Sequence, residues 1–444
     1  MCARLLTGCA LLLAVAIGLA CGDDDSPGDA TPPATATRRV TAAPTRSPAA
    51  TPAPLHTNPP SAPYVGSGTL AVINARIIDG TGAPPIESGF VFVRDGRIES
   101  VGPGAPADTA DVVIDAAGRT VMPGLGDGHV HITRTIVSVD ADMAGTVNED
   151  GLVPFVHGGI TNLREVGTAT VIMQSLKVLT DGLVREGRAP RVTWAGPIIT
   201  TTGGYPFTVQ RYSPGGQAVA SAEEGVEMVN DLADWGARII KLGLEQGYYA
   251  DEGWPLMDLP TVQAITEAAH ARGLLVTAHV TSLDEVRLAL DGGVDNLAHT
   301  PLQLLTNDLI EEMIEADMGI VSTAIIWDPN AAGIAAENVR RYAAAGGTIA
   351  IGTDYGCCEQ LPGPEALLRE MQFLYIDGGV ALDDLLVAAT RGVAAVTGTD
   401  ADVGTLEAGK LADMIILGGD PLTEIAALGD VELVIVGGDV VYER

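Results

Sequence analysis

The sequence predicts an α/β fold: a (β/α)8 TIM barrel with a small β-sandwich-like domain formed from both ends of the mature chain. Short apolar runs alternate with helical patterns through the middle of the chain, which is typical of βα units and a parallel sheet. Eight such runs are present, which is the number that closes a barrel. They end near His131, Glu165, Ala195, Lys241, His279, His299, Thr323 and Asp354.

Helical patterns separate the predicted strands. Residues 259–272 form one predicted helix with an apolar face, and Gly273 follows it as a stop signal. Residues 282–290 form another, which ends at the pair Gly292-Gly293. These helices supply the second half of each βα unit.

Strand patterns also occur at both ends of the mature chain. Residues 70–78 and 90–93 run as strands, and a turn at Asp95-Gly96 leads into residues 98–101, as in a β-hairpin. Residues 412–417 and 431–436 are the matching strands near the C-terminus. We expect the two ends to pair in one small β-domain. The predicted boundaries are residues 67–122 and 401–444 for this domain and residues 123–400 for the barrel.

The first residues carry the pattern of an export signal. An apolar run at residues 11–20 is too short to span a bilayer comfortably, and Cys21 follows it at once. This resembles the lipobox of bacterial lipoproteins, although Gly18 stands where a leucine is usual. We expect residues 1–21 to be a signal or lipoprotein peptide, with the protein held in the cell envelope by a lipid on Cys21. A simple cleaved signal, giving a secreted or periplasmic protein, is the alternative.

Residues 22–66 are rich in proline, threonine and alanine. Such a segment cannot bury enough apolar surface to offset the entropy of ordering it. We therefore expect a disordered linker that holds the folded part away from a surface.

The charge and the cysteines narrow the possible partners. The net charge is −32, which argues against nucleic acid and anionic lipid surfaces, so a membrane is expected as a partner through the lipid anchor only. Three of the five cysteines belong to the signal, so the chain has no disulfide framework. The sequence does not set an oligomeric state.

Two histidines stand at the end of the first barrel strand. His129 and His131 are at i and i+2, so on a strand both side chains point to the same face. In barrels of this kind active sites lie at the C-terminal ends of the strands. A single histidine there is usually a core residue, whereas two on one inward face favour a metal site.

Three further candidate ligands occupy other strand ends. His279 ends the fifth strand and His299 ends the sixth, and either alone would be weak evidence. Asp354 ends the buried eighth strand, where a carboxylate can also serve as a helix N-cap. Together with four histidines, Asp354 is interpreted as a metal ligand and proton carrier.

Lys241 ends the fourth strand, which is otherwise apolar from Ile239 onward. An ammonium would be repelled by divalent cations and could not coordinate them. The neutral amine reacts with carbon dioxide to form a carbamate, an anionic group with two oxygens that can bridge two metals. Pairing of Lys241 with Glu245 or Asp354 is the alternative, and the surrounding ligands favour the carbamate.

Together these residues resemble the amidohydrolase superfamily, nearest its prolidase and imidazolonepropionase-like branch. The resemblance covers roughly residues 68–444. Its marks are residues 123–131, 240–241, 278–279, 292–299 and 352–354, followed by the tail at 404–413 and 419–422.

The resemblance implies a site for two divalent metal ions. His129, His131, Lys241 and Asp354 would hold one ion, and Lys241, His279 and His299 would hold the other, with carbamylated Lys241 as the bridging ligand. Zinc is the first expectation, because imidazole and carboxylate ligands with open positions suit it.

The resemblance also implies an activity. A hydroxide bridging the metals would hydrolyse a C–N bond in a small amide, dipeptide, N-acyl amino acid or cyclic amide. Asp354 would be the catalytic residue, taking a proton from the water and passing it to the leaving nitrogen. Tyr205, Tyr248 and Tyr249 are candidates for substrate binding, although loop tyrosines are more often packing or surface residues.

Two alternatives stay open. Deaminases on the same barrel often carry one metal and a glutamate three residues after the strand-five histidine, where this chain has Ser282. A catalytically inactive, surface-displayed binding module would be indicated by the loss of a ligand, and all six ligands are present.

Overall fold

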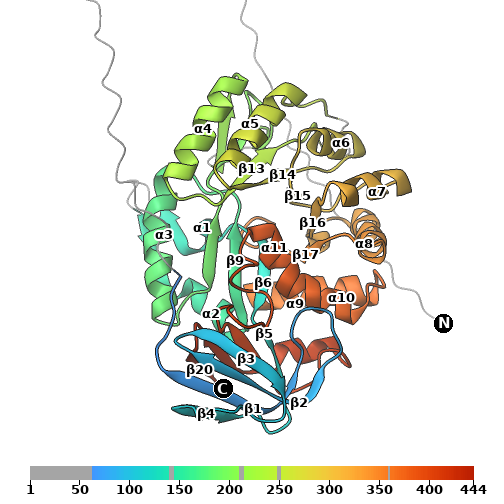
Figure 1. Ribbon diagram of the computed structural model, residues 1–444. Coiled ribbons are helices and arrows are strands. Elements are labelled where there is room, and N and C mark those ends of the chain that lie inside the picture. Colours follow the sequence, from blue (N-terminus) through green and yellow to red (C-terminus); the bar gives the residue numbers. More distant parts are fainter. Residues whose placement is uncertain (1–62, 140–144, 210–214, 248–251, 359–360) are drawn as a thin grey trace, which may run out of the picture. The chain divides into compact units, whose positions relative to one another are not determined.

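The middle of the chain alternates parallel strands and helices, as the sequence predicts (Figure 1). The computed structural model describes residues 63–139, 145–209, 215–247, 252–358 and 361–444. The predicted signal, almost all of the predicted linker and the predicted lipidation site Cys21 lie outside the described residues. The described residues belong to one compact unit, His56–Arg444.

All eight predicted barrel strands are present, and each ends within three residues of its predicted end. They belong to two parallel sheets with the orders β10-β9-β6 and β12-β11-β13-β14-β15-β16-β17. Backbone hydrogen bonds from Arg238 to Trp194 (3.0 Å) and from His131 to Tyr355 (2.7 Å) connect the two sheets. The strands are β6 (Leu125–Val130), β9 (Ile160–Glu165), β10 (Arg191–Trp194), β13 (Ile239–Gly243), β14 (Leu275–His279), β15 (Asn296–Leu297), β16 (Gly319–Ser322) and β17 (Ile349–Ile351), with β11 (Ile198–Thr201) and β12 (Gly216–Val219) beside them.

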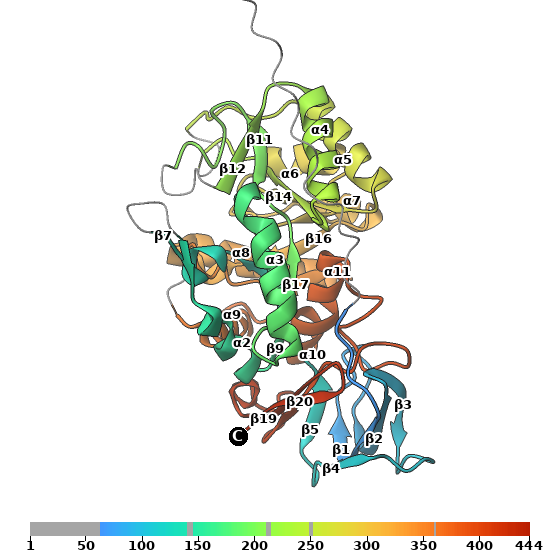
Figure 2. The same ribbon diagram turned by 90° about the vertical axis from the view of Figure 1, so that its left-hand side faces the viewer.

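Helices follow the strands, and five of the described helices begin at a side-chain cap. Ser282 and Glu285 form a capping box at the start of α6, and Asp258 caps α5, so both predicted helices are confirmed. In the part of the chain that the structure describes, no helix is long and apolar enough to cross a membrane. Figures 1 and 2 show α4 to α8 along the outer side of the strands. The helices are α1 (Thr133–Ile136), α2 (Val153–His157), α3 (Thr170–Arg185), α4 (Ala222–Asp234), α5 (Leu259–Ala271), α6 (Leu283–Asp291), α7 (Asn307–Glu315), α8 (Pro329–Ala344), α9 (Gly363–Ile376), α10 (Leu382–Val387) and α11 (Val393–Thr397).

Short elements complete the connections. A π-helical turn lies between α10 and α11, and Gly392 at its end has no room for a side chain, since a Cβ there would lie 2.0 Å from the carbonyl oxygen of Ile349. This close approach lets α11 pack against β6, β9, β16 and β17. The remaining short elements are β7 (Val137–Val139), β8 (Gly145–Val147), η1 (Glu149–Leu152), η4 (Ala324–Ile326), η5 (Ala388–Gly392) and η6 (Ile425–Gly429).

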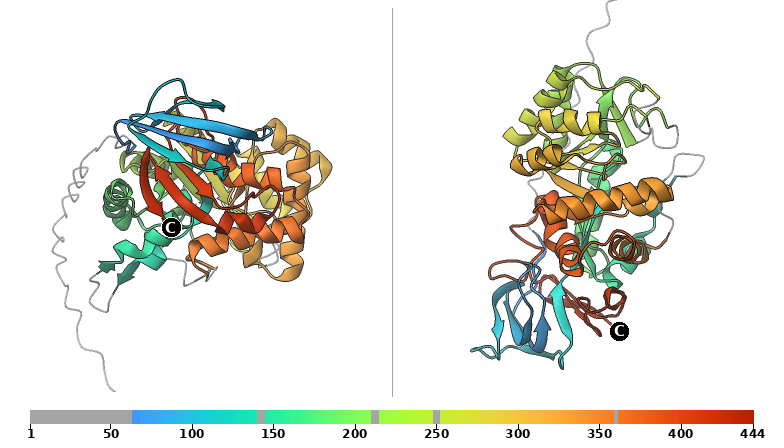
Figure 3. Two further views of the ribbon diagram at one scale, coloured as in Figure 1. Left: turned by 90° about the horizontal axis from the view of Figure 1, so that it is seen from below. Right: turned by 90° about the vertical axis from the view of Figure 1, so that its right-hand side faces the viewer.

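Strands from both ends of the described chain form a third sheet, as predicted (Figures 1 and 3). Its order is β20-β19-β18-β5-β1-β2-β3, with β4 beside β1. The antiparallel pair β5 and β18 joins the two ends, with Met122 opposite Ile415. The sandwich-like form and the limits of this domain stay predictions. Its strands are β1 (Thr69–Ile77), β2 (Ile86–Arg94), β3 (Arg97–Pro103), β4 (Val112–Asp115), β5 (Thr120–Pro123), β18 (Met414–Leu417), β19 (Val431–Val436) and β20 (Asp439–Glu443).

One ion pair ties this sheet to the parallel strands. Arg191, at the start of β10, donates to both carboxylate oxygens of Asp413, which directly precedes β18. Arg191 also donates to the carbonyl oxygen of Tyr64, and the backbone of Gly437 donates to Asp413. The side chains are only 15% and 2% exposed, so solvent screens this pair weakly.

We expect the Arg191→Met substitution to destabilise the fold by about 3 kcal/mol, because it leaves the buried Asp413 carboxylate without its cation. Chemical denaturation followed by circular dichroism measures this loss. Arg287→Met is the matched control, since Arg287 and its partner Glu312 are 42% and 47% exposed and their pair should contribute less than about 1 kcal/mol. Equal losses in the two variants would contradict the special role of the Arg191 pair.

Candidate metal centre

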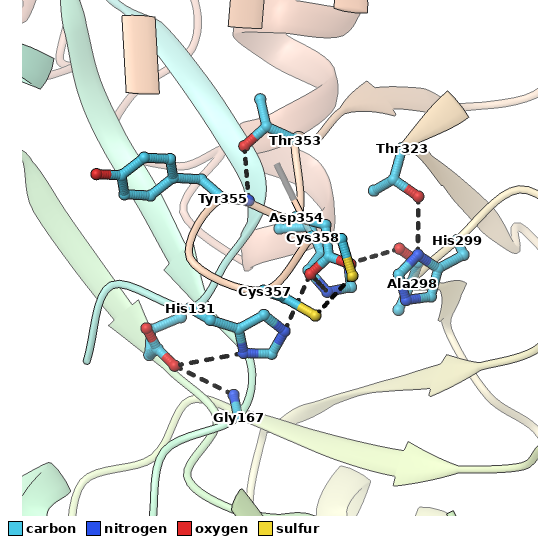
Figure 4. Close-up of polar contacts among 12 residues, drawn as sticks. His131, Gly167, Ala298, His299, Thr323, Thr353, Asp354, Tyr355, Cys357 and Cys358 are labelled. Atoms are coloured by element: carbon cyan, nitrogen blue, oxygen red, sulfur yellow. Dashed lines mark hydrogen bonds and ion pairs between the residues drawn. The ribbon is translucent and has the colours of Figure 1, made fainter. Parts of the chain in front are cut away.

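Two histidines at the end of β6 come to one place: His129 lies on the strand, and His131 follows directly after it. His129 and His131 are both buried, and their Nε2 atoms lie 3.4 Å and 3.1 Å from the same oxygen, Oδ1 of Asp354. The three residues offer ligand atoms that all lie within 4.8 Å of one another. Figure 4 shows the contact of His131 with Asp354. The structure therefore brings three of the six predicted ligands together as one group.

Asp354 reaches this group from the turn after β17. Its backbone adopts the left-handed conformation, with φ at 55°, and its N–H donates to the carbonyl oxygen of His129 at 2.8 Å. Its Oδ1 atom is buried and accepts no hydrogen bond. The oxygen that faces both histidines is thus available to a further ligand.

The other two histidines lie beside this group. The ring centroids of His129 and His299 are 4.4 Å apart, and those of His279 and His299 are also 4.4 Å apart. The four predicted histidine ligands from β6, β14 and the segment after β15 therefore form one continuous cluster. The other described histidines take part elsewhere: His157 stacks on Tyr442, and His270 pairs with Asp295.

Each of three histidines has one ring nitrogen bound by a neighbour. Nδ1 of His129 donates to the carbonyl oxygen of Ala298 at 2.7 Å, and Nδ1 of His299 contacts Oγ1 of Thr323 at 2.7 Å. Nε2 of His279 contacts a carboxylate oxygen of Glu245. Such partners fix the ring and leave the opposite nitrogen for a metal ion.

Lys241 is buried in β13, 1% exposed. Burial lowers the pKa of its amine well below the ordinary value, and the buried guanidinium of Arg164 lowers it further. Of the two carboxylates that the sequence offers as its partners, Glu245 contacts His279, and Asp354 faces His129 and His131. A neutral amine is the form that reacts with carbon dioxide.

The donor set fits a divalent metal ion. Burial lowers the pKa of His129 well below its ordinary value, so its ring is neutral and its Nε2 carries a lone pair once Nδ1–H is donated to Ala298. That lone pair faces the lone pairs of Asp354 Oδ1 across 3.4 Å. Two acceptors that face each other in a buried space repel unless a cation or a proton lies between them. A bound cation satisfies both.

Asp127 holds the two ligand-bearing segments in register. Its carboxylate accepts hydrogen bonds from Oγ1 (2.6 Å) and N–H (3.1 Å) of Thr353 and from N–H of His129 (3.1 Å). Burial raises the pKa of Asp127 to about 7, although these hydrogen bonds oppose the rise. The residue therefore connects Thr353, the neighbour of Asp354, to His129, one of the proposed metal ligands.

Arg164 is a fully buried cation in β9. It donates to the carbonyl oxygens of Gly128 and Val396 and to the side-chain oxygen of Asn296. Burial lowers its pKa to about 9. Its positive charge further lowers the pKa of His299, after the larger effects of burial and the neighbouring His279 and Lys241.

Of the predicted substrate-binding tyrosines, the structure describes only Tyr205. Its ring stacks on His279, with centroids 4.1 Å apart, and it packs in an apolar cluster with Ile198 and Trp254. Tyr248 and Tyr249 lie outside the described residues.

The sequence did not reveal the roles of four buried polar residues beside the proposed ligands: Asp127, Arg164, Glu245 and Thr323. Asp127 stands two residues before His129, so its strand position was a usable signal. Thr323 and Glu245 act on histidines 24 and 34 residues away in the chain, and no local pattern marks such pairs.

We expect the Glu245→Gln substitution to lower zinc affinity by about 10- to 100-fold, because a neutral amide orients and polarises His279 less well than a carboxylate. Zinc retained against graded chelator concentrations measures the affinity. Glu267→Gln, on the exposed face of α5, is the matched control and should leave zinc affinity unchanged. Equal affinities in the two variants would show that Glu245 does not act on the metal site.

Several known proteins are similar to this chain in sequence or in fold. An uncharacterized protein of Mycobacterium tuberculosis is 29% identical over 76% of this chain and 77% of its own length. The imidazolonepropionase of Symbiobacterium thermophilum is 27% identical over 76% of this chain and 85% of its own. The structure of a Xaa-Pro dipeptidase with bound methionine has a TM-score of 0.71 at 24% identity, covering 85% of this chain and 100% of that one, which shows a TIM-barrel-like α/β fold. Residues 120–441 match the amidohydrolase family, and because this match spans most of the chain, the protein is a member of that family.

Proposed function

We propose that this hydrolase of carbon–nitrogen bonds is a binuclear metal-dependent enzyme that cleaves a small amide, dipeptide, N-acyl amino acid or cyclic amide. Its family, an imidazolonepropionase relative and a dipeptidase fold neighbour support the bond class. The observation that carries the metal site is the convergence of acceptor atoms from His129, His131 and Asp354 on one buried point.

The ligands divide into two groups in this proposal. His129, His131 and Asp354 would hold one ion, His279 and His299 the second, and a carbamate on Lys241 would serve both. When bound, divalent cations such as zinc supply positive charge that polarises a substrate carbonyl and lowers the pKa of water. We propose further that the eight parallel strands close into one barrel around these ligands, supported by the backbone hydrogen bonds between the two sheets.

Asp354 is proposed as the proton carrier. Its Oδ1 atom is buried and accepts no hydrogen bond, so no protein donor competes for it. The backbone hydrogen bond to His129 and the short turn after β17 hold the carboxylate in place. From this position it takes the proton of the attacking water and returns it to the leaving nitrogen.

The alternatives receive less support from the structure. The position three residues after His279, where deaminases often have a glutamate, is Ser282, and its hydroxyl caps α6 by accepting from the backbone of Glu285. A binding module without catalysis would not need a buried carboxylate oxygen held beside two metal-facing histidines. Both features favour hydrolysis.

We expect the zinc-loaded protein to hydrolyse members of a dipeptide and N-acyl amino acid library, and Asp354→Asn to lower kcat/KM by about 100- to 10,000-fold, because the amide cannot accept the proton. Product amine is the measured quantity. Asp308→Asn, on the exposed face of α7, should retain full activity. A library with no substrate, at verified zinc occupancy, would refute the proposed activity.

We expect the Lys241→Ala substitution to remove both zinc and activity, because the residue that would carry the carbamate ligand is lost. Added short-chain carboxylic acids should restore part of both, since their carboxylate can occupy the place of the carbamate. Zinc content and hydrolysis are measured at increasing concentrations of the added carboxylic acid, at constant pH. Lys177→Ala, on α3, is the control and should keep its zinc and its activity with or without the added acid. Full zinc binding by the Lys241→Ala variant without any acid would contradict a carbamate ligand.

A further inference from the structure

Two adjacent cysteines lie in the turn that carries Asp354. The Sγ atoms of Cys357 and Cys358 are 2.9 Å apart, and the two residues do not form a disulfide (Figure 4). Both side chains are half-buried, so part of each is accessible to solvent. Their sulfur atoms also lie within 4.8 Å of a carboxylate oxygen of Asp354.

The turn that holds these thiols is fixed to the proposed ligands. The backbone N–H groups of Cys357 and Cys358 both donate to the carbonyl oxygen of Asp354, at 3.1 Å and 3.3 Å. Gly356, with φ at 84°, packs so closely that a Cβ there would lie 2.3 Å from the carbonyl oxygen of His131. A change in the shape of this turn should therefore also shift Asp354 and His131.

We propose that Cys357 and Cys358 form a reversible thiol–disulfide modification site whose oxidant is a low-molecular-weight disulfide, and that its closure weakens metal binding at Asp354 and His131. The proposal that the two cysteines are modified depends only on the contact between their sulfur atoms. Its effect on metal binding also rests on the proposed metal centre.

The chemistry is two successive thiol–disulfide exchanges. One cysteine, as its thiolate, attacks a sulfur of the oxidant, forms a mixed disulfide and releases one small thiol. The second thiolate attacks the cysteine sulfur of the mixed disulfide, forms the Cys357–Cys358 bond and releases the other small thiol. The protein loses two electrons and two protons, and the oxidant is reduced to two thiols.

Closure must reshape the turn. Neighbouring Cα atoms across a trans peptide lie about 3.8 Å apart, whereas ordinary disulfides join Cα atoms about 4.4–6.8 Å apart. A bond between adjacent cysteines is therefore strained and readily reduced, as expected of labile, regulatory disulfides. The strain falls on the residues that position Asp354.

The test treats the reduced, zinc-loaded full chain with oxidised glutathione and maps its thiols by peptide mass spectrometry. The peptide with both cysteines should become lighter by two hydrogen atoms, carry no glutathione, and return to its original mass with dithiothreitol. Zinc affinity, measured by chelator competition, should fall about 10-fold or more on oxidation and recover on reduction. Persistent glutathione on the wild-type peptide, or an unmodified peptide at high oxidant, would overturn the proposal.

Two variants make the test specific. Cys358→Ser should stop at the mixed disulfide on Cys357 and keep glutathione, because the second thiol is missing. The double variant Cys357→Ser/Cys358→Ser should fold, and its zinc affinity should be the same with and without oxidant. If oxidation also removes zinc from the double variant, the oxidant acts at another site, and the proposed link between the Cys357–Cys358 disulfide and metal binding is refuted. Thiol mapping detects the disulfide even if the protein hydrolyses no substrate, so failure of the proposed activity can be distinguished from failure of the disulfide proposal.

Discussion

The arrangement of the candidate site depends on the buried carboxylate of Asp127, which connects two segments of the chain. It accepts hydrogen bonds from the backbone of His129 on β6 and from both the backbone and the hydroxyl of Thr353 after β17. These two segments supply three proposed ligands, and they come from residues more than 220 positions apart in the chain. One buried acceptor therefore sets the spacing between His129 and Asp354 before any ion binds. Its burial costs free energy that three hydrogen bonds offset.

The charges around these residues favour neutral forms of the proposed ligands, although the whole chain has a net charge of −32. Arg164 is buried and donates hydrogen bonds to Gly128 on β6, Asn296 on β15 and Val396 on α11. With burial, its charge favours neutral forms of His129, His299 and Lys241, the forms that bind a metal or react with carbon dioxide. The ligands are thus prepared by desolvation and by one fixed charge.

Much of the fold followed from local patterns, and the rest from contacts that no local pattern encodes. Eight apolar runs predicted the parallel strands, and helical patterns that stop at glycines predicted α5 and α6. The i, i+2 spacing predicted the shared face of His129 and His131, which the structure confirms. Strand β5 was missed because its four residues run directly into the turn before β6. The roles of Glu245 and Thr323 were missed because each contacts a histidine that is distant in the chain.

The pairing of β5 with β18 has a consequence for how the molecule is made. Residues 120–123 are synthesised nearly three hundred residues before Met414–Leu417, so β5 waits with one edge uncovered until the last strands leave the ribosome. Unpaired strand edges attract other chains, and long-range pairings form slowly. Synthesis of the long middle of the chain thus delays the pairing of β5 with β18. Until β18 has been made, nascent chains must be kept apart to avoid association through the open edge of β5.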